Sequence, residues 1–221
     1  MCNYVIYFLM GCDDMLLNYL KENYKIGIPI FTTDIKIPNL SEKNLRYHLR
    51  KLTEDGIICR FEAGVYYFPK TNIFGEKIEL SPDIVIFHKY ISKDGKRIGY
   101  YSGNTLANKL GLSTQVPFIQ EIVSNNAPAP YREITVGGRQ FILRRPSCEI
   151  TDKNVYTLQL LDCLKDIDKC AEESMLYCGE VLTNFAIKHQ ITKDMINEVI
   201  DKYPIKIYKS IYDTEVKYVS A

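Results

Sequence analysis

The chain has 221 residues, of which 28 are lysine or arginine, 27 are aspartate or glutamate, and 46% are hydrophobic. This composition excludes a disordered or fibrous chain, and the net charge of +1 excludes a polycation that coats nucleic acid without specificity. The net charge is still compatible with a locally basic face, because an average over the whole chain conceals where the charges are concentrated. The length fits one large or two small domains, and the element pattern predicts an α+β protein.

The N-terminal residues 1–12 form an expected extension ahead of the first domain. Their apolar run, Tyr4–Met10, is shorter than the roughly 20 residues that span a bilayer, and no cation precedes it as in a signal peptide. We expect a strand or packed arm here. The seven cysteines include no Cys-x-x-Cys pair, so reduced thiols in a cytoplasmic protein are expected rather than a zinc site.

The elements predicted for residues 13–70 follow the order of a winged helix-turn-helix. Leucines at helical spacing predict a helix over Met15–Tyr24, and an extended segment follows at Pro29–Phe31. Thr32–Asp34 then begins a short helix or turn. This part of the chain therefore opens with two helical segments separated by an extended one.

A third and longer helix follows Ser41, which is a good N-cap. Its leucines recur at helical spacing, and Asp55-Gly56 ends it. Two β-like runs, 57–61 and 65–68, are joined by a turn that contains Gly64, which predicts a hairpin. The hairpin would be the wing.

Residues 71–79 are expected to be a linker, and residues 80–221 a mixed α+β domain with a β-hairpin and a helical C-terminal part. Gly137-Gly138 gives the clearest turn signal in the chain. The elements expected in this domain are helices over 82–92 and 102–110, a strand over 118–123, a hairpin of 131–136 with 140–144, and helices over 155–165, 172–188 and 192–203.

The helix after Ser41 is the best candidate for a functional element. If Leu45, Leu49 and Leu52 face inward, the helical repeat turns a basic and polar set outward. Arginine and lysine bind phosphates or guanine, asparagine binds adenine, and tyrosine reaches the backbone of DNA. An ordinary solvated helix face is the alternative. The DNA-binding candidates are Lys43, Asn44, Arg46, Tyr47, Arg50 and Lys51.

Basic residues gather a second time in the central hairpin, at Arg132, Arg139, Arg144 and Arg145. They predict a second nucleic-acid or partner surface, or else an exposed sheet face whose arginine stems cover apolar atoms. From 149 to 180, by contrast, acidic residues outnumber basic ones, which offsets both basic segments in the net charge.

Catalytic motifs are nearly absent from the sequence. Asp166-Ile167-Asp168 has the form of a magnesium-binding pair, but a helical pattern surrounds it and no phosphate-binding loop precedes it. We assign no catalytic, cofactor-binding or metal-binding residues and expect a protein that is not an enzyme.

One segment is more specific than these patterns: Leu106–Pro117, with the letters LANKLGLSTQVP, followed by Arg132-Glu133-Ile134. It resembles the central signature of AbiEi-family antitoxins from type IV toxin–antitoxin modules. The runs 31–34, 49–58 and 64–67 are similar to the winged-helix start of that family. The resemblance covers most of residues 13–150, and the helical tail matches in layout only.

The resemblance implies a two-domain protein. Its winged helix would bind inverted repeats of double-stranded DNA in its own promoter and repress it, and a homodimer would suit such half-sites. Its C-terminal domain would counter a nucleotidyltransferase-like toxin from the neighbouring gene, without an assumed stable complex. Residues 1–12 lie ahead of the usual family start.

Three other functions fit the same sequence. A winged-helix regulator with a ligand-sensing or dimerising C-terminal domain needs no toxin, and the neighbouring gene distinguishes the two. A nucleotide-processing enzyme would use Asp166 and Asp168 with a metal. A pure interaction protein would keep the fold without binding DNA.

Overall fold

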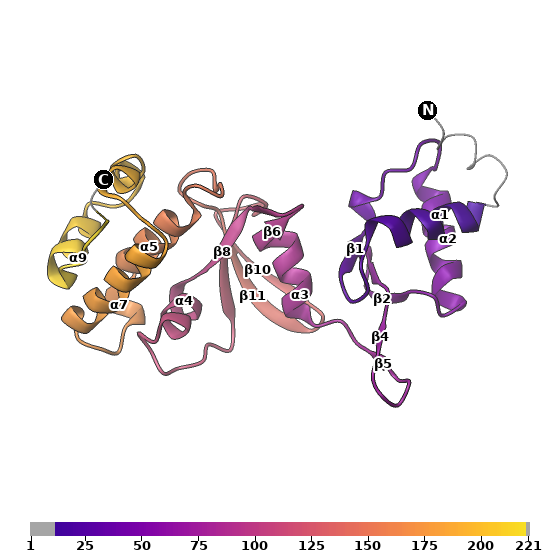
Figure 1. Ribbon diagram of the computed structural model, residues 1–221, viewed down its shortest axis with the longest axis horizontal. Helices are drawn as coiled ribbons and strands as arrows, with labels where there is room; N and C mark the ends of the chain where they lie inside the picture. The colour runs from indigo at the N-terminus through magenta and orange to yellow at the C-terminus, as the bar shows by residue number, and fades with distance from the viewer. Residues whose placement is uncertain (1–11, 220–221) are drawn as a thin grey trace. The chain divides into compact units, whose positions relative to one another are not determined.

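The computed structural model describes residues 12–219 and divides them into two compact units, with the boundary between Val85 and Ile86 (Figure 1). Both helices and strands occur in each unit, so the fold is mixed α+β as predicted. The apolar run 4–10, for which we predicted a strand or arm, lies outside the described residues. The boundary falls within helix α3 (Pro82–Ile86).

The first unit packs helices against a three-stranded antiparallel sheet with the strand order β1-β3-β2. Leu16, Leu20, Ile30 and Leu49 are completely buried between the helices and the sheet. The predicted elements are all present, with small shifts at their ends. They are α1 (Cys12–Asn23), β1 (Pro29–Phe31), the 3₁₀ turn η2 (Thr32–Asp34), α2 (Glu42–Glu54), β2 (Cys59–Glu62) and β3 (Val65–Tyr67).

Helix α2 forms for the reasons that its sequence gives. The Ser41 hydroxyl accepts a hydrogen bond from the Asn44 backbone amide, which caps the first turn. Leu45, Leu49 and Leu52 are buried, so the apolar stripe faces the core as predicted. Beyond the helix Gly56 adopts φ +71°, a left-handed conformation that glycine reaches without strain.

The segment 71–79, expected to be a linker, contains a small hairpin. Strands β4 (Lys70–Thr71) and β5 (Lys77–Ile78) pair antiparallel around the turn 72–76. The Lys77 ammonium donates to the Gly56 carbonyl oxygen at 2.8 Å, which ties this hairpin to the end of α2. The hairpin therefore belongs to the first unit.

The second unit is built on a four-stranded sheet with the order β10-β11-β9-β8. Strands β10 (Tyr131–Val136) and β11 (Arg139–Arg144) form the predicted hairpin. Strand β9 (Gln120–Ser124) pairs parallel with β11 and begins two residues later than predicted. The edge strand β8 (Gly99–Ser102), which the sequence analysis missed, pairs antiparallel with β9.

Helices cover both faces of this sheet (Figure 1). On one face lies the π-helical turn η3 (Phe87–Ile91), which continues the predicted helix 82–92. It approaches Gly99 so closely that a Cβ added there would lie 2.0 Å from the Tyr90 carbonyl oxygen. The other face meets α4 (Gly103–Leu110) and α5 (Val155–Lys165). A short hairpin, β6 (Ser92–Lys93) with β7 (Lys96–Arg97), precedes β8.

The remaining helical elements contribute to the same hydrophobic core as α5. They are α6 (Ile167–Cys170), α7 (Met175–Lys188), α8 (Lys193–Asn197), the 3₁₀ turn η4 (Ile200–Lys202) and α9 (Lys206–Thr214). The prediction of one continuous helix over 192–203 is wrong. Thr192 caps α8, but β-branched Val199 leaves the helical conformation, with φ −126°, and the chain turns into η4. The helix predicted from 172 begins at Met175, where Ser174 caps it.

A buried carboxylate joins α5 to the sheet. Asp162 is only 4% exposed and accepts hydrogen bonds from the Tyr100 hydroxyl at 2.8 Å and from the Lys165 ammonium at 3.1 Å. The Ser102 hydroxyl adds a longer contact at 3.4 Å. A charge this deeply buried is tolerated because it is paired and hydrogen-bonded.

This cluster predicts that the protein loses stability in alkali. Burial, together with the Asp162 carboxylate, raises the pKa of Tyr100 well above 10.0, so the folded state retains a proton that the unfolded state releases. Stability contributed by Tyr100 is complete below about pH 10 and falls by about 1.4 kcal/mol per pH unit above it. Urea unfolding of wild type and Tyr100→Phe at about pH 8 and about pH 11 measures this difference. Equal alkaline losses in the two proteins would contradict it.

Candidate nucleic-acid interface

The outer face of α2 carries the predicted DNA-binding residues. Lys43, Asn44, Arg46, Tyr47, Arg50 and Lys51 are all exposed, and Tyr47 is 61% exposed although its ring is large and apolar. Three leucines hold the opposite face against the core. The helix therefore presents one polar, cation-rich face to solvent.

Two of the arginines are ion-paired along the helix. Arg46 contacts the Glu42 carboxylate and Arg50 contacts the Glu54 carboxylate, each at 2.8 Å. The arginine side chains remain 75% and 74% exposed, and an exposed pair at this spacing contributes only about 0.3–0.5 kcal/mol. The carboxylates therefore orient the guanidinium groups without preventing them from binding an anion.

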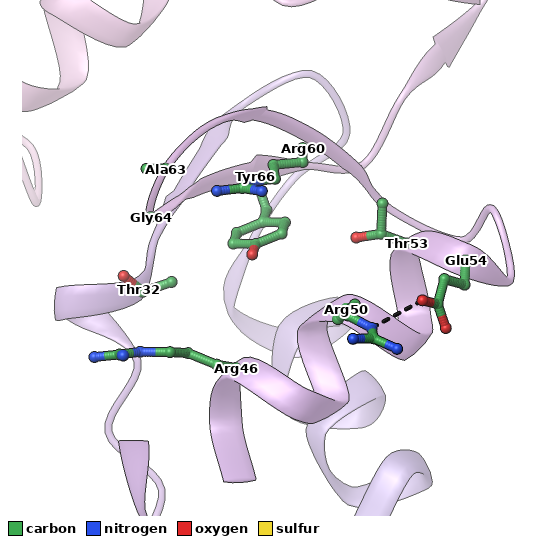
Figure 2. A pocket seen from close by; sticks show the side chains of 9 residues that line it. All are labelled: Thr32, Arg46, Arg50, Thr53, Glu54, Arg60, Ala63, Gly64 and Tyr66. Atoms are coloured by element: carbon green, nitrogen blue, oxygen red, sulfur yellow. Dashed lines mark hydrogen bonds and ion pairs between the residues drawn. The ribbon is translucent and has the colours of Figure 1, made fainter. Parts of the chain in front are cut away.

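A groove of about 610 Å³ lies between α2 and the β2–β3 hairpin (Figure 2). Arg46 and Arg50 line it from α2, and Arg60 lines it from β2. The Tyr66 side chain projects from β3 into the space between the hairpin and the helix. The other lining residues are Thr32, Thr53, Glu54, Ala63 and Gly64.

The end of the groove is fixed by the turn of the hairpin. Gly64 adopts φ +78°, and its carbonyl oxygen accepts a hydrogen bond from the Thr32 amide at 2.9 Å. This bond joins η2 to the hairpin, so three elements hold the walls of the groove. Three guanidinium groups from two elements around one groove suit an oxyanion such as a phosphate.

Sequence reasoning missed Arg60. The alternation of the β2 strand gives it an exposed position beside half-buried Cys59 and Phe61, but that pattern alone describes many surface arginines. Only the packing of the hairpin beside α2 brings Arg60 into the same groove as Arg46 and Arg50.

The second predicted basic set does not form one surface. The register pairs Arg132 with Leu143 and Arg139 with Val136, whereas Arg144 pairs with Tyr131 on the opposite face of the sheet. Arg145 lies beyond β11 and donates to the Pro128 carbonyl oxygen at 2.9 Å. Strand alternation therefore separates residues that are clustered in the sequence.

Arg144 has a structural role in this sheet. Its guanidinium contacts the Glu121 carboxylate of β9 at 2.9 Å and lies 5.9 Å from the Tyr131 ring centroid. Glu121 also lies where a side chain at Gly103 would be, since an added Cβ would approach its carboxylate within 2.4 Å. The pair joins two parallel strands to the start of α4.

The aspartates considered for metal binding lie apart from any cluster of metal ligands. Asp166 contacts the ammonium groups of Lys165 at 3.6 Å and Lys206 at 3.9 Å, and Asp168 is exposed on α6. Among the described residues, no group of three or more histidine, cysteine or acidic side chains is placed to hold a metal ion. The cysteines at 59, 148, 163, 170 and 178 carry free thiols.

Comparison with known proteins supplies a family but no activity. Over residues 12–219, no helix combines the length and the apolar character needed to cross a membrane. No curated protein matches the chain. A family model matches residues 16–199, most of the chain and parts of both units. The chain therefore belongs to DUF6088, a family of unknown function.

Proposed function

We propose that this protein is a DNA-binding antitoxin and transcriptional autorepressor of a type IV toxin–antitoxin module. Its first unit would be a winged helix-turn-helix, in which α1, η2 and α2 are the three helical elements and the β2–β3 hairpin is the wing. The observation that carries the DNA-binding proposal is the groove in which Arg46 and Arg50 of α2 meet Arg60 of β2.

In this proposal α2 enters the major groove of DNA, which is wide enough for a helix. Asn44 is suited to bind the edge of adenine and Tyr47 to contact the sugar–phosphate backbone. The groove between α2 and the hairpin would hold a backbone phosphate among its three guanidinium groups. The buried leucine stripe keeps this face in a fixed orientation.

Arg60 tests the phosphate assignment by itself. We expect Arg60→Ala to reduce the slope of log affinity against log salt by about one and to weaken upstream and unrelated duplexes alike, because a phosphate contact carries no sequence information. Lys36→Ala removes an equal charge from an exposed position outside the groove and is the matched control. Fluorescence anisotropy titrations over a salt series measure both. An unchanged slope for Arg60→Ala would remove it from the interface.

The antitoxin half of the proposal rests on the resemblance of residues 106–117 to the central signature of AbiEi-family antitoxins. In this segment Gly111 ends α4 with φ +77°, and the Thr114 amide and hydroxyl donate to the Glu172 carboxylate at 2.9 and 3.0 Å. Val116 and Phe118 are 81% and 86% exposed. The corner is thus firmly held while it presents apolar side chains to solvent.

If DNA binding belongs to the first unit and toxin neutralisation to the second, a mutation should be able to remove one activity and leave the other. When the full chain is co-expressed with a nucleotidyltransferase-like product of the neighbouring gene, we expect growth to be restored by wild type and equally by Arg46→Ala/Arg50→Ala. A reporter driven by the upstream region should be repressed by wild type only. Absence of rescue by wild type would contradict the antitoxin assignment, and unchanged repression by the variant would contradict the DNA-binding assignment.

A further inference from the structure

The β4–β5 hairpin carries two large apolar side chains at its tip. Ile73 is 94% exposed and Phe74 is 81% exposed, so neither contributes to a core. The turn does not require them, because Asn72 and Gly75, with φ +81°, supply its geometry. Figure 1 shows this hairpin projecting from the body of the first unit.

The tip is held rigidly. The Asn72 side-chain oxygen accepts hydrogen bonds from the Phe74 and Glu76 amides, each at 2.9 Å. The Asn72 side-chain amide donates to the Glu76 carboxylate at 2.8 Å, and the Asn72 backbone amide donates to the Glu76 carbonyl oxygen at 2.9 Å. A turn whose backbone is already fixed presents its apolar side chains with little backbone ordering cost on binding.

The base of the hairpin carries two lysines and lies at the end of α2. Lys70 and Lys77 are exposed, one on each strand, and Glu76 and Glu79 are the exposed carboxylates beside Lys77. The bond from Lys77 to the Gly56 carbonyl oxygen uses one of the three ammonium hydrogens. A ligand held along α2 therefore meets the hairpin just beyond the C-terminal end of that helix.

From this arrangement, and resting on the DNA-binding function proposed above, we infer that the Ile73–Phe74 tip is a wedge that enters the minor groove and separates two stacked base pairs. Duplex DNA has an apolar stacked interior, which matches the apolar side chains at the tip, and the two lysines at the base can contact its phosphates while Asn72 holds the Glu76 carboxylate within the turn. Isoleucine and phenylalanine are among the side chains that unstack bases and kink a duplex in this way.

The test uses the full chain and a duplex from the region upstream of its gene, labelled at both ends for energy transfer. We expect wild type to bend this duplex by at least about 20°. Ile73→Ser/Phe74→Ser should leave it straight and bind about tenfold more weakly, since the stacking contact is lost. Ile78→Ser is the matched control, because Ile78 is 47% exposed on the same hairpin but away from its tip.

The outcomes separate this inference from the function on which it rests. If wild type and the double serine variant bend and bind the duplex alike, the wedge is wrong while DNA binding stands. If wild type binds no duplex, the proposed function itself fails. If the double variant loses self-association or vesicle binding while duplex bending is unchanged, the tip serves another partner and the wedge is overturned. Bending lost in the double variant and kept in Ile78→Ser supports it.

Discussion

Replacing Arg46 and Arg50 together by alanine is expected to lower affinity for the upstream duplex by about a hundredfold or more and to reduce the salt slope by about two. Both side chains line the groove beside the hairpin, and both are about three-quarters exposed. The substitution also leaves the Glu42 and Glu54 carboxylates without their arginine partners, which adds repulsion toward phosphates. Anisotropy titrations at several salt concentrations measure affinity and slope together.

A charge-matched control distinguishes this groove from general attraction. Lys21→Ala/Lys36→Ala removes two cations that are exposed on the first unit but do not line the groove. We expect this variant to bind nearly as wild type does. Equal losses in the two double variants would mean that net charge, and not the α2 groove, determines binding.

The second large effect is expected at Gly179 of α7. An added Cβ there would lie 1.6 Å from the Thr214 carbonyl oxygen at the end of α9, so α7 and α9 must separate to accommodate it. Backbone cannot rotate away as a side chain does. We expect Gly179→Ala to lower the free energy of unfolding by about 3 kcal/mol or more and the Tm by about 10 °C.

The sign of this effect makes the test decisive. Helix propensity alone predicts that Gly179→Ala stabilises α7 by about 1 kcal/mol. Glu180→Ala, at the adjacent exposed position, keeps the helix and should change stability by less than about 0.5 kcal/mol. Thermal unfolding followed by circular dichroism compares the three proteins. A raised Tm for Gly179→Ala would show that α7 and α9 do not pack as described.

The elements of the first unit could be predicted because their signals are local. Ser41 caps α2, the three leucines fix its buried face, and Gly64 supplies a conformation that the hairpin turn needs. The groove could not be predicted in the same way. It depends on Arg60, whose position beside α2 results from packing between elements that are separated in the sequence.

Two prediction errors in the second unit have a common physical cause. Tertiary packing determines which secondary structure a short apolar segment adopts. The edge strand β8 is too short to show a distinctive alternation of apolar and polar residues, and its extended conformation is determined by its pairing with β9. Val199 and Ile200 are buried at helical spacing from Ile196, yet the chain turns between α8 and η4 to bury them.

The basic hairpin shows how sequence clustering misleads on strands. Arg139, Arg144 and Arg145 are close in sequence, but neighbouring positions of a strand point to opposite faces. On α2, in contrast, residues three and four apart share a face, so the predicted set stays together. The helical candidates are therefore the ones that the structure brings to one surface.

Binding of the full wild-type chain to its own upstream region tests the central claim most directly. Anisotropy of a labelled upstream duplex, competed with a scrambled duplex of equal length and composition, measures affinity and specificity together. We predict a specific complex that is at least about a thousandfold tighter than the complex with the scrambled duplex, with affinity that falls steeply as salt rises. Equal affinity for the two duplexes, or no binding at low salt, would contradict it.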